Sequence, residues 1–254
     1  MTLAQKRNGL FSSSPPSLQI ISIFLVSALY TGFVLGSAAD RLAVSRSEIA
    51  QRVPSFFASE ALRVGGAQAL AAGKAQEMTA FGTQALRDAP TDPQSAAMLG
   101  AGLLASGAQV KADQAFRVAG GLGWRVPITQ SYWLSKSLAD NDYKMASLRL
   151  DALLRQQPHL VSQRLLLDPM ERNPAGRAAL IDRMYLRPEW LPIYTSDVAA
   201  SPADAMVQRS DLLEEAASKG LILGCDMIAP MIARLTALNL NAAADRLSRA
   251  HCSQ

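Results

Sequence analysis

Few side chains in this chain could carry chemistry. It has 254 residues but only two histidines and two cysteines. His159 follows a helix-stopping proline and His251 lies near the end of the chain, so we expect both at solvated helix ends rather than in a proton relay. The sequence has no phosphate-binding glycine loop, no G-x-S-x-G elbow, no H-E-x-x-H motif and no cysteine pair with metal-ligand spacing. We therefore predict no catalytic residue, no metal site and no cofactor.

The densest group of carboxylates is Glu214-Glu215 with Asp211. Two carboxylates that converge on one bond can cleave a glycoside. Adjacent residues on a helix, however, point about 100° apart, so this stretch predicts a solvated helix face. We predict that the protein is not an enzyme. The alternative is a cell-wall hydrolase or another envelope enzyme with a helical superstructure, which would need a convergent acid and base.

The composition predicts an all-α protein. Hydrophobic residues make up 49% of the chain and aromatic residues only 6%. Alanine and leucine dominate, whereas the β-branched and aromatic residues that favour strands are few. The net charge of +4 is small, and the basic residues are scattered rather than clustered. Nucleic acid is therefore not expected as a partner.

The N-terminal region predicts a membrane segment. No charged residue occurs between Arg7 and Asp40, and residues 18–36 read LQIISIFLVSALYTGFVLG. As a helix this run would be roughly 28 Å long, close to the thickness of a bilayer core. We predict a short tail over residues 1–17, a transmembrane signal anchor over residues 18–36 and a juxtamembrane linker or helix over residues 37–58.

The side of the membrane is less clearly marked. Positive charges before the run (Lys6, Arg7) nearly balance those after it (Arg41, Arg46, Arg52). A short basic start followed at once by a long apolar run is typical of a signal anchor. We therefore predict a single-pass inner-membrane protein with its body in the periplasm. A cytosol-facing, membrane-tethered adaptor would keep the fold and reverse the side.

The middle of the chain repeats with a period of 34 residues, in units that begin at Ser59, Pro93 and Pro127. The fifteenth residue of each unit tolerates the left-handed conformation that ends a helix: Gly73, Gly107 and Asn141. Four other places hold residues suited to close helix packing: Gly66, Gly100 and Leu134; Met78, Ala112 and Ala146; Gly82, Phe116 and Leu150; Ala85, Ala119 and Leu153. The pattern predicts stacked helix hairpins.

These columns resemble the tetratricopeptide repeat (TPR) family over residues 59–160. The second unit matches best, through Leu99-Gly100, Gly107, Ala112, Phe116 and Ala119. The chain departs from the family pattern at Met78 and Gly82 of the first unit, which could be a capping helix pair, and at Trp124, which replaces a proline. The resemblance implies a solenoid of helix hairpins that binds protein partners.

The resemblance also implies a concave groove lined by the first helix of each unit. Its candidate lining residues are Glu60, Arg63, Leu70, Gln94, Leu104, Ile128, Ser131 and Leu138. Such a groove would be almost uncharged, so it would hold an apolar helix of a partner or be filled by the protein's own C-terminal helices. Trp124 and Arg125, after a glycine-rich stretch, form a second candidate partner patch.

The C-terminal region, residues 161–254, is predicted to be helical and to end in a capping hairpin. Residues 186–195 are expected to form a loop whose Trp190 plugs a seam. Cys225 and Cys252 lie about equally far from Leu238-Asn239, so an antiparallel hairpin that turns there brings them level. This geometry permits a disulfide, which would persist only in an oxidising compartment. The alternative is two buried free thiols in a reducing cytosol.

Taken together, these features predict a membrane-anchored, extracytoplasmic interaction scaffold of the TPR type. By analogy with anchored repeat proteins, we expect an accessory subunit of a cell-envelope assembly or polysaccharide-export machine. Its partners would be envelope proteins, and the sequence leaves their identity and the oligomeric state open.

Overall fold

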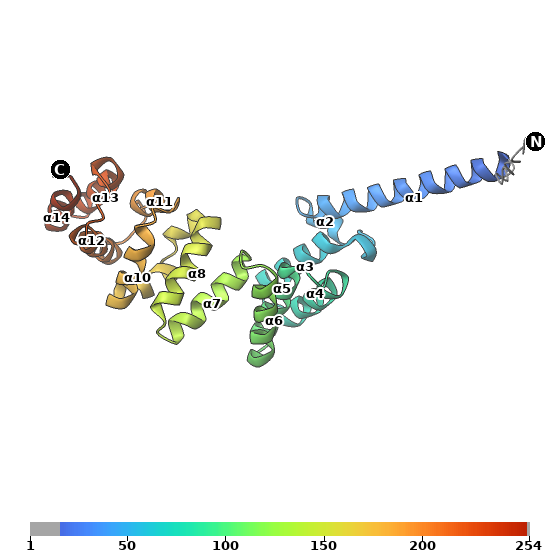
Figure 1. Cartoon of the computed structure of the whole chain (residues 1–254), viewed down its shortest axis with the longest axis horizontal. Helices are drawn as coiled ribbons and strands as arrows, with labels where there is room; N and C mark the ends of the chain where they lie inside the picture. The colour runs from blue at the N-terminus through green and yellow to red at the C-terminus, as the bar shows by residue number, and fades with distance from the viewer. Residues whose placement is uncertain (1–15, 253–254) are drawn as a thin grey trace, which may run out of the picture.

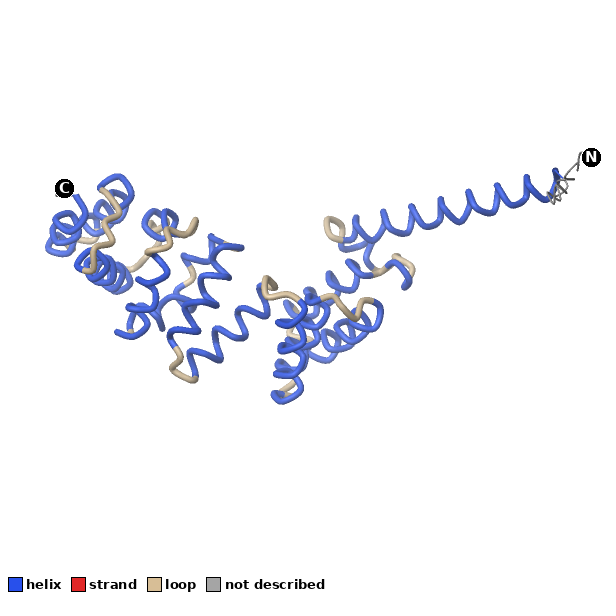
Figure 2. Tube along the Cα trace, viewed as in Figure 1, coloured by secondary structure: helices blue, strands red, loops and turns tan. Residues whose placement is uncertain are grey.

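The protein is all-helical throughout the part of the chain that the structure describes. This structure is a computed structural model that describes residues 16–252, so most of the predicted tail, residues 1–17, lies outside the described residues. Figure 1 shows a long N-terminal helix followed by two lobes of short helices, and Figure 2 shows the brief loops that join them. No strand occurs within residues 16–252.

Helix α1 (Pro16–Ala43) is long, apolar and exposed. Within its residues 20–43, an 18-residue stretch has a mean hydropathy of 2.0, and α1 is the one helix within residues 16–252 that is long and apolar enough to cross a membrane. The helix continues past Gly36, where the predicted anchor ends. No proline or other helix breaker follows Gly36, so part of the predicted linker at 37–58 belongs to the same helix.

Asp40 ties this helix directly to the first hairpin. Its buried carboxylate accepts hydrogen bonds from the Ser59 hydroxyl (3.2 Å) and from the backbone N–H groups of Glu60 (3.1 Å) and Ala61 (2.9 Å). The first-turn N–H groups of a helix have no partner inside that helix, so a carboxylate placed there caps it. The two short elements between, α2 (Ser47–Ala50) and the 3-10 turn η1 (Ser55–Phe57), complete this junction.

Three helix hairpins follow, and their first helices begin 34 residues apart, at the positions that the sequence period predicts. In order these helices are α3 (Ser59–Ala71), α4 (Ala75–Asp88), α5 (Pro93–Ala105), α6 (Gln109–Leu122), α7 (Pro127–Ala139) and α8 (Tyr143–Gln156). The turns contain Gly73, Gly107 and Asn141, with φ of 68°, 81° and 57°. The predicted left-handed conformation at these three residues is confirmed. All twelve residues of the four packing columns are buried.

The first two hairpins pack through glycine. A Cβ atom at Gly82 of α4 would lie 2.6 Å from the Leu99 backbone, and one at Gly102 of α5 would lie 2.7 Å from the Thr79 backbone nitrogen. Real Cβ atoms do not approach other atoms so closely. The backbones of α4 and α5 therefore touch at two points where only a hydrogen can fit.

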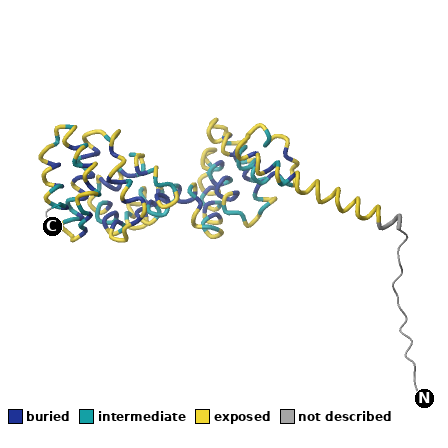
Figure 3. Tube along the Cα trace, turned by 90° about the horizontal axis from the view of Figure 1, so that it is seen from above, coloured by how far each residue is buried: buried dark blue, intermediate teal, exposed yellow. Residues whose placement is uncertain are grey.

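The two lobes differ in how their cores are built (Figure 3). Up to α7, the buried side chains fall into small separate clusters. From Leu134 to Leu247 they form one continuous cluster. That cluster crosses residue 160, so the end of the predicted repeat region is not a break in the core.

Seven elements follow α8 in the C-terminal lobe. They are η2 (Pro158–Ser162), α9 (Arg164–Arg172), α10 (Pro174–Met184), α11 (Leu191–Ser196), α12 (Ala203–Ser218), α13 (Cys225–Ala237) and α14 (Asn241–Cys252). Helix α11 overlaps the stretch 186–195 that the sequence predicts as a loop, so that prediction is wrong for residues 191–195. Trp190, which directly precedes α11, holds this segment against the core. Its ring is fully buried, and its Nε1–H donates a hydrogen bond to Asp151 (2.8 Å).

Helices α13 and α14 form an antiparallel hairpin at the end of the lobe. Asn239, in the turn, has a φ of 60°. A disulfide joins Cys225, the first residue of α13, to Cys252, the last of α14, with Cα atoms 4.7 Å apart. The covalent bond closes the open end of the hairpin.

The glycine contact between α4 and α5 generates a stability prediction. Gly82→Ala should lower the free energy of unfolding by on the order of 1–3 kcal/mol, because the new methyl group must push the two backbones apart. Gly121→Ala in α6 is the matched control, since a Cβ there meets nothing within 4 Å. It should be neutral or slightly stabilising. Equal effects of the two substitutions on thermal unfolding of the detergent-solubilised protein would contradict this packing.

Candidate functional site

An open groove runs across α3, α5 and α7, the first helices of the three hairpins. It encloses about 670 Å³, and its lining is mostly apolar. The lining residues are Leu70, Ala101, Leu104, Ala105, Gln109, Phe116, Ile128, Ser131, Tyr132, Ser135, Lys136, Ala139 and Asp140. Leu70, Leu104 and Ile128 are 48%, 39% and 40% exposed, so three large apolar side chains, one from each hairpin, are available to a ligand.

The floor of the groove is an aromatic stack between the second and third hairpins. The rings of Phe116 and Tyr132 are stacked with centroids 4.0 Å apart. The Tyr132 hydroxyl donates to Asp113 and accepts from the Gln109 side chain at 3.2 Å. Asp113 also pairs with Lys136 at 3.2 Å. This network packs α7 against α6 beneath the groove.

The electrostatic character of the groove is close to neutral. Lys136 and Asp140 are its only charged lining residues, and Lys136 is already paired with Asp113. An ion pair within the wall leaves little field to attract a charged ligand. The groove is therefore suited to apolar burial, with Gln109, Ser131 and Ser135 as hydrogen-bonding groups at its rim.

Four of the eight groove residues predicted from the sequence line this groove: Leu70, Leu104, Ile128 and Ser131. Glu60, Arg63 and Gln94 do not line it. Arg63 donates to Gln94 (2.6 Å) and pairs with Glu60 (3.2 Å), so these three bridge α3 and α5.

Leu138 does not line the groove either, because it packs against the C-terminal core. The same core occupies the surface next to the third hairpin. Tyr132, Phe116 and Gln109 line the groove although the sequence pattern did not identify them. The repeat pattern assigns the groove to the first helix of each hairpin, whereas Gln109 and Phe116 lie on α6, the second helix of its hairpin.

The second candidate patch, Trp124 and Arg125, lies in the link between α6 and α7. Trp124 is 53% exposed, and the Arg125 guanidinium carbon lies 4.9 Å from the centre of its ring. The Trp124 carbonyl accepts a hydrogen bond from the Gln130 side chain. Neither residue lines the groove, so the patch is a separate feature.

The acidic stretch on α12 is paired within the protein. Glu214 pairs with Arg246 of α14 (2.9 Å), whereas Glu215 pairs with Arg177 of α10 (3.1 Å). The two carboxylates thus face different helices, as the 100° step of a helix requires. Hydrogen bonds from Lys219 and Arg177 lower the pKa of Glu215 and outweigh the opposite effect of desolvation. Neither residue is placed to share a substrate bond.

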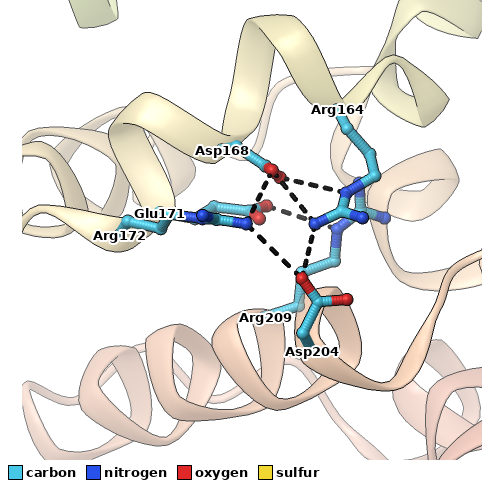
Figure 4. Close-up of polar contacts among 6 residues, drawn as sticks. All are labelled: Arg164, Asp168, Glu171, Arg172, Asp204 and Arg209. Carbon is cyan, nitrogen blue, oxygen red and sulfur yellow. Dashed lines mark hydrogen bonds and ion pairs between the residues drawn. The ribbon is translucent and has the colours of Figure 1, made fainter.

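A cluster of charges joins α9 to α12 (Figure 4). At its surface Arg164 and Arg172 both contact Asp168 and Asp204. Beneath them is a buried ion pair between Glu171 and Arg209, 3.2 Å apart and at most 2% exposed.

Burial raises the pKa of Glu171, and the Arg209 charge opposes this rise. Tyr194 completes the set by donating to Glu171 at 2.7 Å, while Arg209 donates to the Val161 carbonyl at 2.9 Å. This group is fully enclosed, so it fixes the lobe's packing and is not accessible to a substrate. No simple spacing in the sequence identifies it.

His251 is also enclosed. Its Nδ1 accepts from the Leu223 backbone N–H (3.3 Å), and its Nε2 lies 3.1 Å from the Leu213 carbonyl. These partners require a neutral ring that carries its proton on Nε2. The expectation that His251 is solvated is wrong, because α14 packs back onto α12. Burial lowers the pKa of His251 below its usual value of 6.5, against the hydrogen bond to Leu213.

Residues 16–252 contain no group of three His, Cys, Asp or Glu side chains that could hold a metal ion. Comparison of the whole chain with protein-family models, curated proteins and solved structures finds no match. The assignment of a function therefore depends on the groove, the long apolar helix α1 and the disulfide.

The buried His251 generates a pH prediction. In the unfolded chain its pKa is near 6.5, whereas in the folded protein it is lower, so the unfolded chain binds the proton more readily. The contribution of His251 to the free energy of unfolding should be fully present above pH 6.5 and should decrease as the pH falls below that value. His251→Gln should be less stable at about pH 7.5, through lost hydrogen bonds, but should show a flatter decline toward about pH 5.5. Parallel pH profiles of the two proteins in thermal unfolding would contradict the buried neutral ring.

Proposed function

We propose that this protein is a membrane-anchored scaffold that binds an apolar segment of a partner protein in the groove across α3, α5 and α7. The observation that carries the proposal is the groove itself. Three exposed apolar side chains from three consecutive hairpins line one open, nearly uncharged channel. A helix that presents apolar residues at every third or fourth position would bury its face against them.

The repeat architecture supports the proposal. Hairpins that begin 34 residues apart, with small residues at the helix contacts and left-handed residues in the turns, favour the TPR family as the origin of residues 59–160. Solenoids of this kind present concave surfaces for protein partners. By analogy with anchored repeat proteins, the complex would be a cell-envelope assembly or polysaccharide-export machine, with this chain as a non-catalytic accessory subunit.

Two features support a proposal for the side of the membrane on which the lobes lie. Helix α1 is preceded by a short basic segment that is typical of a signal anchor, and the far end of the molecule carries a disulfide. Disulfides persist in oxidising compartments and are rare in the cytosol. We infer that α1 crosses the inner membrane and that the two lobes lie in the periplasm.

Groove binding predicts a specific loss of partners. Leu104→Glu would place a charge in the middle of the groove, and co-purification of the partner from the native membranes should be lost. Val118→Glu on α6 is the matched control, because Val118 is 50% exposed and does not line the groove. Both variants should fold, since both side chains are already partly solvated. The same co-purified proteins in quantitative mass spectrometry of both variants and the wild type would contradict the groove as the binding site.

An oxidising compartment predicts that the disulfide is present in the protein as it is made in cells. Protein whose thiols are alkylated during cell lysis should contain no alkylated cysteine, and mass spectrometry should find the peptides of Cys225 and Cys252 joined. Reduction should then destabilise the C-terminal hairpin by roughly 3.5 kcal/mol, the chain-entropy value for a loop with a sequence separation of 27 residues. Two alkylated cysteines in freshly trapped protein would instead favour the cytosol-facing adaptor.

A further inference from the structure

The turn between α2 and α3 exposes an aromatic side chain beside the membrane helix. Phe56, in η1, is 85% exposed, the largest exposed fraction of any aromatic side chain described in the structure. Within residues 16–252, Phe56 lines a shallow cavity with Glu60 and Asp88, but most of its ring stays uncovered. Exposing a whole phenyl ring to water is unfavourable, and an exposed apolar group often marks a binding surface. The position of Phe56 relative to α1 indicates what it could bind.

The position of this turn along α1 is fixed by contacts. The neighbouring Phe57 packs edge-to-face on Phe33 of α1, with ring centroids 5.4 Å apart, and on Phe56 at 5.2 Å. The Phe57 ring also lies where a Cβ atom at Gly36 would be. Figures 1 and 2 show the chain after α2 running back alongside α1. The hydrogen bonds from the first turn of α3 to Asp40 fix the C-terminal end of this turn against α1 as well.

The depth of the turn follows from the distribution of charge on α1. The first charged residues after the apolar run are Asp40 and Arg41. Charged side chains are costly in the hydrocarbon, so these residues mark the headgroup level. Phe33 is seven residues before Asp40, which is about 10 Å closer to the bilayer centre along the helix. A turn that contacts Phe33 and Gly36 therefore reaches below the headgroups.

We propose that the η1 turn is a second membrane contact, in which Phe56 inserts into the boundary between headgroups and acyl chains in the leaflet where α1 emerges. Aromatic side chains are favoured at this boundary. Arg41 on α1 is exposed, and so is Arg52, four residues before Phe56, so both are available to the phosphate groups of lipids. Two contacts, a spanning helix and an inserted turn, set the tilt of the hairpins and of their groove relative to the bilayer.

The inference rests on α1 spanning the membrane, which is part of the proposed function, and the experiment separates the two. Both native cysteines are in the disulfide, so Phe56→Cys introduces one free thiol for a nitroxide label. The full chain is reconstituted into phosphatidylethanolamine–phosphatidylglycerol vesicles, and collisions of the label with oxygen, which is concentrated in lipid, and with a water-soluble nickel chelate are measured. Leu165→Cys on α9, 89% exposed in the far lobe, is the water control, and Leu29→Cys, 66% exposed on α1, is the lipid control.

The label at residue 56 should show an oxygen-to-nickel collision ratio several-fold higher than the label at residue 165, and closer to that at residue 29. A ratio at 56 equal to that at 165, with residue 29 in lipid, would overturn the inserted turn and leave the anchor intact. Water accessibility at both 29 and 56 would overturn the anchor itself. Protection of residue 56 from both probes would also overturn the inference, since it would mean that protein covers Phe56.

Discussion

The close approach of α4 and α5 at Gly82 and Gly102 is the constraint on which the groove across α3, α5 and α7 depends. A single helix hairpin cannot bury its own apolar face, so each must stack on the next. With only hydrogen atoms at these two contacts, the first two hairpins stack backbone to backbone. The first helices α3 and α5 are thereby brought to one side, and the exposed Leu70 and Leu104 face the same channel.

The next junction is built differently, and the difference produces the groove. Between α6 and α7 the contact is made by the Phe116–Tyr132 stack and the Asp113–Lys136 pair. The side chains at this contact are much larger than the glycines between α4 and α5. The third hairpin is therefore held farther from the second, while its own Leu138 packs into the C-terminal core. That core, fixed by the buried Glu171–Arg209 pair and closed by the disulfide, supports the far wall of the channel. At the other end, the Asp40 carboxylate ties the long apolar helix α1 directly to the first hairpin.

Much of this architecture could be predicted from local sequence, because the determinants are local. The 34-residue spacing marks the hairpins, Gly73, Gly107 and Asn141 mark their turns, and the uncharged run before Asp40 marks the exposed helix. What could not be predicted depends on contacts distant in sequence. The capping role of Asp40, the burial of His251 and the α11 helix around Trp190 all depend on partners 20 or more residues away. For the same reason, only half of the predicted groove residues line the groove: Arg63 finds Gln94, and Leu138 finds the C-terminal core.

The central claim, that the groove is the working surface of the protein in its own membrane, is tested most directly by site-specific photo-crosslinking in intact cells. A photoreactive amino acid would replace Leu70, Leu104 or Ile128 in the groove, and Val118 or Met145 on the outer helices, all at least 38% exposed. The account predicts that the three groove positions crosslink to the same partner polypeptide and that the two outer positions do not. Equal crosslinking from both faces, or from neither, would contradict it.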